Sequence, residues 1–304
     1  KLRKRIDLVN GATSRTGGVY LYANQKGIDG EGQTYYDASA MISVNGQLIA
    51  QSRQFSFEDV EVVTARVCLD DLRVFRGLTQ SLGNQGAALS DPYPKIFAPF
   101  IVSKKSFESI SAPMEPLILT KQEEFALAAA HWMWDYLRKS GAGGFFLALS
   151  GGADSGACAL LTFYLAELLV KESSGSGEVR SQIMETFGLP LESIESPQYL
   201  TNVLLHTAYI GSENSSPETR KIAETLAESI GAYHIYFPMN SIVASIISGI
   251  KAVLCFTPKF RSEGGSKAES LALQNLQARL RMVLSYLCAQ LLPVSRNYAK
   301  SLLV

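Results

Sequence analysis

The chain has 304 residues, enough for two hydrophobic cores, because one core seldom grows beyond roughly 250–300 residues. Lysine plus arginine and aspartate plus glutamate number 28 each, so the formal net charge of zero gives no electrostatic attraction for nucleic acid or an anionic membrane. No apolar run reaches the ~18 residues of a membrane span, and the four cysteines and three histidines show no metal-ligand spacing. Scattered thiols are typical of a reducing compartment, so we expect a cytoplasmic protein that binds neither nucleic acid nor membrane.

The first ~76 residues predict an all-β region. Apolar and polar positions alternate over 19–24, the period-two pattern of a strand. A second apolar stretch, 38–44, is followed by Asn45-Gly46 and resumes over 48–50. This dipeptide is the strongest short signal for a hairpin, because both residues tolerate positive φ. The β-branched run 60–67 predicts a further strand.

The periodicity fades between residues 77 and 116, where five prolines predict a linker. We therefore expect one domain over 1–112 and a second over 113–304. The chain begins without methionine and ends on an apolar run that is typical of a strand start, so we expect it to be part of a longer protein.

The second part alternates helix and strand. Helical periodicity of apolar residues, capping residues and short apolar runs predict the elements in chain order: helix 123–139, strand 145–149, helix 155–171, strand 203–210, helix 216–230, strand 233–237 and helix 267–292. This order predicts a parallel sheet with helices on both faces.

The segment Ser150-Gly151-Gly152-Ala153-Asp154-Ser155 connects a predicted strand to a predicted helix, where open α/β sheets bind ligands. The two glycines let backbone N–H groups approach phosphate oxygens, and the helix N-terminus adds partial positive charge. Ser150 and Ser155 can donate hydroxyl hydrogen bonds to the same oxygens, and Asp154 fits this anion site as a ligand of Mg²⁺. A glycine-rich turn capped by an aspartate is the alternative, but the flanking strand and helix favour a phosphate site.

Polar residues of the last predicted helix indicate a second binding group. Asn275 and Arg279 are one helical turn apart, and Arg281 lies on a neighbouring face. Guanidinium groups bind phosphate and carboxylate bidentately, although a solvated polar face would show the same spacing.

Ser-Gly-Gly-x-Asp-Ser after an apolar strand resembles the loop of the N-type ATP pyrophosphatases, which cleave ATP between its α and β phosphates. Within that group the chain resembles the glutamine-dependent NAD synthetases of the two-domain eukaryotic kind. Residues 209–216 are similar to the segment after the family's second strand, 272–282 to its Asn-x-x-Ala-Arg-x-Arg-Met helix, and 18–27 to late strands of its nitrilase-like glutaminase domain. The resemblance implies an α/β fold: the β-rich C-terminal part of a nitrilase-like sandwich, followed by a Rossmann-like ATP pyrophosphatase domain.

The resemblance also implies amidation of deamido-NAD (nicotinic acid adenine dinucleotide) to NAD through an adenylated intermediate, with ammonia taken from glutamine. It implies that ATP, a co-substrate with Mg²⁺, is bound by the loop and the end of its strand. The implied ATP-binding residues are Ala148, Leu149, Ser150, Gly151, Gly152, Ala153, Asp154 and Ser155, with catalytic roles for Ser150 and Asp154, Mg²⁺ at Asp154, and deamido-NAD or ATP at Asn275, Arg279 and Arg281.

Other features of the family are expected outside this chain. We expect its Cys-Glu-Lys glutaminase residues upstream of Lys1, its second Mg²⁺-binding acid beyond Val304, and a homo-oligomer. Two alternatives stay open: another amidating ATP pyrophosphatase of the GMP or asparagine synthetase type, and a non-catalytic nucleotide-binding relative.

Overall fold

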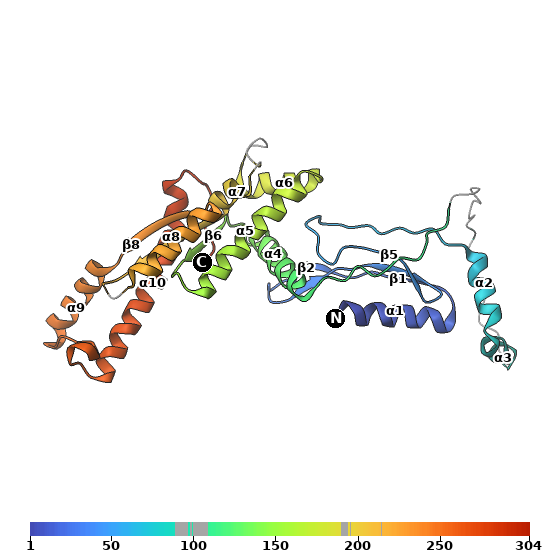
Figure 1. Ribbon diagram of the computed structural model, residues 1–304, viewed down its shortest axis with the longest axis horizontal. Helices are drawn as coiled ribbons and strands as arrows, with labels where there is room; N and C mark the ends of the chain where they lie inside the picture. Colours follow the sequence, from blue (N-terminus) through green and yellow to red (C-terminus); the bar gives the residue numbers. More distant parts are fainter. Residues whose placement is uncertain (89–96, 98, 100–108, 190–193, 195, 214) are drawn as a thin grey trace. The chain divides into compact units, whose positions relative to one another are not determined.

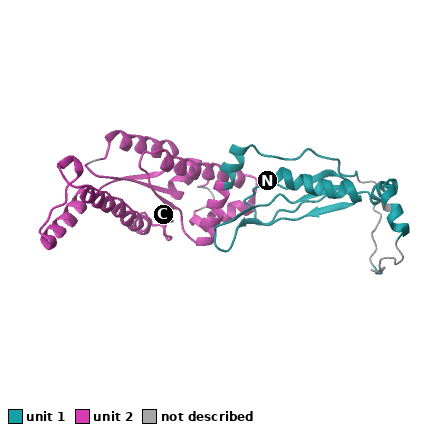
Figure 2. Ribbon diagram, turned by 90° about the horizontal axis from the view of Figure 1, so that it is seen from below, with its two compact units in different colours: residues 1–128 teal, residues 129–304 magenta. Residues whose placement is uncertain are grey.

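The computed structural model describes residues 1–88, 97, 99, 109–189, 194, 196–213 and 215–304 (Figure 1). Much of the predicted linker and Asn214 therefore lie outside the described residues. The chain divides into two compact units, Lys1–Ala128 and Ala129–Val304 (Figure 2), each of which is described separately below. The predicted domain boundary at 112/113 falls close to the linker and stays a prediction.

The described residues of the first unit form two small antiparallel sheets and three helices, and helix α4 spans the boundary between the two units. Its elements are α1 (Leu2–Thr16), β1 (Val19–Tyr22), β2 (Lys26–Ile28), β3 (Tyr35–Asp37), β4 (Met41–Val44), β5 (Gln47–Gln51), α2 (Leu69–Leu78), α3 (Gln80–Ala88) and α4 (Lys121–Ser140). One sheet has the order β1-β4-β5, and the other pairs β2 with β3.

The predicted hairpin is confirmed. Strands β4 and β5 pair antiparallel, and the turn between them places Asn45 at φ 49° and Gly46 at φ 89°. The hairpin is covered by α1, whose buried residues recur at helical spacing and pack on Met41 and Leu48. The strand predicted over 19–24 is also confirmed, as β1.

An all-β start of the chain is wrong in three places. Residues 2–16 form helix α1, whose sparse apolar stripe is diluted by charged residues, and residues 69–78 form helix α2. Residues 60–67 form neither a strand nor a helix, so the predicted strand is absent from the described part of the chain. The side chains of Val60 and Val62 are 73% and 77% exposed, so β-branched composition here reflects no buried sheet.

The second unit is built from a parallel sheet and seven helices within its described part. Its elements after α4 are β6 (Phe145–Ala148), α5 (Ala153–Ser173), α6 (Gly177–Phe187), α7 (Pro197–Leu204), β7 (Leu205–Gly211), α8 (Pro217–Ile230), β8 (Tyr233–Pro238), α9 (Asn240–Leu254), the 3₁₀ turn η2 (Arg261–Glu263) and α10 (Lys267–Ser295).

The sheet has the order β6-β7-β8 and all three strands run parallel, which confirms the predicted α/β class for this unit. Beyond β6, Leu303 forms a parallel bridge to Phe145, so a further strand position begins beside β6. Alternate residues of β7 serve two cores: Ala208 and Ile210 pack with α10, and Leu205 and Tyr209 pack with α5 and α8. Helices thus cover both faces of the sheet, as the alternating order predicts.

The ends of α8 and the start of α10 lie at residues that are typical helix caps. Ser216 caps α8 by accepting a hydrogen bond from the N–H of Glu218, and Gly231 ends the helix at φ 74°. Ser266 and Glu269 form a capping box at the start of α10. The sequence prediction missed α6 and α7, which occupy the interval between the predicted helix 155–171 and the next strand.

The buried stripe of α10 differs from the predicted one. Of the six residues expected to be buried, only Leu284 is buried; the others are Leu276, Leu280, Val283, Leu287 and Leu291. Cys288 and Ala289, which were not predicted, are buried beside it. Val283, Leu287 and Leu291 are exposed. The helix has apolar residues on more than one face, so periodicity alone could not identify the face that meets the sheet.

Among the described helices, α5 alone is long and apolar enough to cross a membrane by length and composition. This is weak support for a membrane helix, because core helices meet the same criterion. Six residues of α5, including Leu165 and Leu169, are buried within the second unit.

Candidate nucleotide-binding site

The predicted phosphate loop lies at the carboxyl edge of the parallel sheet, between the end of β6 and the first turn of α5. Gly151 adopts φ +78°, and a Cβ atom built on it would lie 2.2 Å from the carbonyl oxygen of Thr219. The loop therefore requires glycine here for two reasons: the left-handed backbone, and the close approach of α8. Gly152 is the N-cap of α5 and has extended backbone.

Two serine hydroxyls close the loop on its exposed side. The Oγ atoms of Ser150 and Ser155 are 3.0 Å apart, and Ser155 Oγ donates to the carbonyl of Gly152 at 3.1 Å. The N–H of Gly152 donates to Ser150 Oγ at 3.3 Å. These bonds place two hydroxyls and a helix N-terminus side by side, which is the donor set that a phosphate group requires.

A cavity of about 270 Å³ opens next to the loop, between the carboxyl ends of β6 and β7. Arg281 of α10 reaches it from the other face of the sheet, where its Nε donates to the carbonyl of Ile210 at 3.1 Å. The residues that line the cavity belong to β6, β7, α8 and α10 or directly adjoin them. They are Ala148, Leu149, Ser150, Ala208, Tyr209, Ile210, Ser215, Ser216, Thr219 and Arg281.

The structure brings together some of the predicted site residues and separates others. Ala148, Leu149, Ser150 and Arg281 line one cavity, and the Leu149 side chain also packs in the core. The exposed residues Ala153 and Asp154 stand on the first turn of α5, outside the lining. Asn275 and Arg279 lie further toward the start of α10, also exposed and outside it, with Arg279 Nη1 donating to the Asn275 carbonyl at 3.4 Å.

Sequence reasoning missed the contribution of Tyr209 and Thr219. The Tyr209 hydroxyl lies 2.8 Å from Thr219 Oγ1, and both residues line the cavity. Their position at the end of a predicted parallel strand and in the first turn of the next helix was a usable signal, because such positions face the ligand edge of the sheet.

The carboxylate of Asp154 fits a magnesium site in one respect. Within the part of the chain that the structure describes, no hydrogen bond or ion pair occupies it. No group of three or more potential metal-binding side chains occurs among the described residues. Mg²⁺ often needs only one or two carboxylates when substrate phosphates supply the other oxygens, so a single free carboxylate beside a phosphate loop is compatible with it.

The buried histidines lie away from this edge. His206 is fully buried at the amino end of β7, where its Nε2 is 2.7 Å from Nη1 of Arg296. Burial, and then the nearby guanidinium charge, lower the pKa of His206 from 6.5 to about 4. His206 is therefore a neutral, buried residue at physiological pH.

The fold and the site define an α/β domain with a parallel sheet whose carboxyl edge carries a glycine loop, paired hydroxyls and an arginine. The sequence profile of the NAD synthase family matches residues 127–294. The chain therefore belongs to the NAD synthase family.

Relatives and solved structures agree with this assignment. The chain is 43% identical to the glutamine-dependent NAD(+) synthetases of Saccharomyces cerevisiae, over 99% of this chain and 43% of that protein, and of Mus musculus, over 100% and 42%. A crystal structure of a glutamine-dependent NAD(+) synthetase from Cytophaga hutchinsonii has a TM-score of 0.66 and 28% identity, covering 92% of this chain and 39% of that one. The chain thus spans less than half the length of these relatives.

Proposed function

We propose that this chain carries the adenylating site of a glutamine-dependent NAD synthetase, which converts deamido-NAD to NAD with consumption of ATP. The relatives with this name match essentially the whole chain. The observation that carries the proposal is the loop 150–155: Ser150, whose hydroxyl lies 3.0 Å from that of Ser155, lines a cavity that Arg281 also lines.

The reaction divides into two displacements. In the first, a carboxylate oxygen of the pyridine ring attacks the α-phosphate of ATP, and the bond to the β-phosphate breaks to release pyrophosphate. In the second, ammonia attacks the acyl carbon of the mixed anhydride, loses a proton and expels AMP. Both steps need alignment of the reactants and neutralisation of phosphate charge more than they need a protein nucleophile.

The loop residues suit the first step. The N–H groups at Gly151 and Gly152 and the hydroxyls of Ser150 and Ser155 would donate hydrogen bonds to the departing pyrophosphate, where negative charge grows. The start of α5 adds partial positive charge at the same place. Arg281, held by the Ile210 carbonyl, would bind a phosphate or carboxylate oxygen across the cavity.

Asp154 would hold the Mg²⁺ that accompanies ATP. The bound ion would neutralise phosphate charge and so make pyrophosphate a better leaving group. Asn275 and Arg279 would bind substrate only if it extends along α10 beyond the cavity, because both residues lie outside its lining.

The remaining parts of the proposal concern the complete protein. Glutamine would supply ammonia at a separate glutaminase site, and the complete protein would be a cytoplasmic homo-oligomer. Exposed apolar side chains on α10, among them Leu287 and Leu291, support self-association, because burying them in an interface would remove apolar surface from water.

The test is an assay of NAD formation by the complete protein from deamido-NAD and Mg–ATP, with ammonia and with glutamine as nitrogen donors. We expect product with both donors. Amidation of xanthosine monophosphate or aspartate instead would establish the GMP or asparagine synthetase alternative. ATP binding without turnover of any of these substrates would establish a non-catalytic relative.

A further inference from the structure

The first turn of α8 forms the wall against which the phosphate loop is packed. The main-chain carbonyl of Thr219 lies so close to Gly151 that a methyl group there would sit 2.2 Å from it. Any displacement of this turn therefore changes the space available to the loop. The position of α8 therefore helps to determine where the loop's N–H groups lie and in which direction they point.

A hydroxyl pair fastens that turn to the sheet. Tyr209 of β7 is 6% exposed, and its hydroxyl lies 2.8 Å from Thr219 Oγ1 and 3.3 Å from the carbonyl of Ser216. Thr219 Oγ1 donates to the same carbonyl at 2.9 Å. The Tyr209 hydroxyl can donate to Thr219 Oγ1 or to the Ser216 carbonyl, so the two hydroxyls and this carbonyl form one connected group of hydrogen bonds within the protein.

The tyrosine is itself held in place by its neighbours. Its ring stacks with that of Tyr236 at 6.3 Å and 25°, and the guanidinium of Arg220 covers the Tyr236 ring at 3.8 Å. Both rings lie over Gly211, where an added Cβ would approach each of them to 3.1 Å. Arg220 follows Thr219 directly, so the stack fastens the same turn of α8 at a second point.

We propose that Tyr209 and Thr219 are positioning residues for the phosphate loop, acting through the Thr219 carbonyl on Gly151. This inference rests on the proposed function, because it assigns them to the binding of pyrophosphate during adenylation. Their hydroxyls hold the first turn of α8 at the distance that keeps the loop's N–H groups directed toward the ligand. Loss of either hydroxyl weakens that constraint without removing a donor of the loop.

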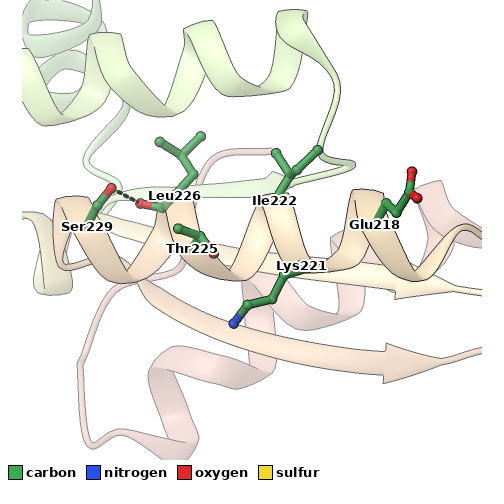
Figure 3. Close-up of a pocket in the computed structure, with 6 residues that line it drawn as sticks. All are labelled: Glu218, Lys221, Ile222, Thr225, Leu226 and Ser229. Atoms are coloured by element: carbon green, nitrogen blue, oxygen red, sulfur yellow. Dashed lines mark hydrogen bonds between the residues drawn. The ribbon is translucent and has the colours of Figure 1, made fainter.

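The outer face of α8 offers a matched control. Thr225 is exposed and lines an open groove on this helix, with Ile222, Leu226 and Lys221 nearby (Figure 3). Thr225→Val makes the same chemical change as Thr219→Val on the same helix, but it does not touch the loop. A general effect of valine on α8 would appear in both variants.

The experiment uses the complete protein and four variants: Tyr209→Phe, Thr219→Val, their double mutant and Thr225→Val. The readouts are the inhibition constant of pyrophosphate, KM for ATP and KM for deamido-NAD, in the ammonia-dependent reaction. Each single change at 209 or 219 should raise the pyrophosphate constant and KM for ATP about five-fold, the size expected for one lost hydrogen bond. KM for deamido-NAD should stay within two-fold, and Thr219→Ser should restore the wild-type values.

Both single changes remove the bond between the two hydroxyls, and each also removes a bond to the Ser216 carbonyl, so the effect of the double mutant should be smaller than the product of the two single effects. The inference would be overturned if the fold-changes of the two single variants multiplied in the double mutant. It would also be overturned if Thr219→Val and Thr225→Val had the same pyrophosphate inhibition constant and the same KM for ATP. If Thr219→Val does not fold, Tyr209→Phe, which removes only an oxygen atom, gives the answer alone. A wild-type protein that forms no NAD would instead refute the proposed function.

Discussion

Gly151→Ala should abolish adenylation by displacing the phosphate loop, with only a modest loss of stability. The added Cβ would lie 2.2 Å from the Thr219 carbonyl oxygen and 2.9 Å from its carbon, so loop and helix must separate by about 1 Å to reach ordinary contact. A misplacement of about 1 Å can reduce a reaction about 100-fold. Alanine at φ +78° also costs roughly 1–2 kcal/mol, because its Cβ approaches the carbonyl oxygen.

Gly141→Ala separates the two effects. Gly141 has φ +70°, and nothing lies within 4 Å of a Cβ built there. Both variants should therefore lower the melting temperature by a few degrees, about 2–4 °C per kcal/mol for a domain of this size. Only Gly151→Ala should lose NAD formation with ammonia and binding of Mg–ATP by calorimetry. The reasoning is refuted if Gly151→Ala keeps more than a tenth of the activity, or if Gly141→Ala loses as much.

Three further changes test separate parts of the site and of the core. Asp154→Ala should remove NAD formation from deamido-NAD and ammonia while leaving the melting temperature within ~1 °C, because the residue is exposed; near-normal turnover would contradict its role with Mg²⁺. Arg281→Lys should raise KM for ATP or deamido-NAD about ten-fold. The arginine can donate to the Ile210 carbonyl through Nε and still offer its two terminal nitrogens to a ligand, whereas lysine has one ammonium group. Unchanged KM values would show that neither substrate contacts Arg281. For His206, the pKa of about 6.5 in the unfolded chain exceeds the value of about 4 in the folded protein. Between these two values the unfolded chain binds more protons, so the free energy of unfolding decreases as the pH is lowered. Lowering the pH from 7 to 5 should cost wild type roughly 2 kcal/mol more than His206→Gln in urea denaturation, and equal losses would contradict the assigned pKa.

The sequence predicted the parallel sheet and the phosphate loop because both depend on local signals. An apolar strand followed by Gly151-Gly152 and an apolar helix identifies the loop, and Ser216-Pro217 identifies the start of α8. The turn at Asn45-Gly46 was predicted on the same basis, since residues that accept positive φ are few.

The errors arose where the answer depends on packing between distant segments. Five of the fifteen residues of α1 are charged, and its four buried positions can be recognised only when β4 and β5 lie beneath them. Residues 60–67 have strand composition but pair with no strand among the residues that the structure describes, and composition cannot supply a partner strand. In α10, the choice between several apolar faces is made by the sheet, and neighbouring residues carry no information about it.

The contact between Gly151 and Thr219 joins residues far apart in the chain. The loop motif predicts that Gly151 must be glycine, but only the fold reveals that α8 enforces it. The pairing of Tyr209 with Thr219 has the same character, because a strand residue and a helix residue acquire a common function at the ligand edge.

The products of ATP cleavage test the central claim most directly. The complete protein is incubated with Mg–ATP, deamido-NAD and ammonia, and phosphorus NMR follows the nucleotide and phosphate species as NAD forms. A loop that holds the departing pyrophosphate predicts one AMP and one pyrophosphate for each NAD. Formation of ADP and inorganic phosphate would contradict it, because the bond broken would then lie between the β and γ phosphates.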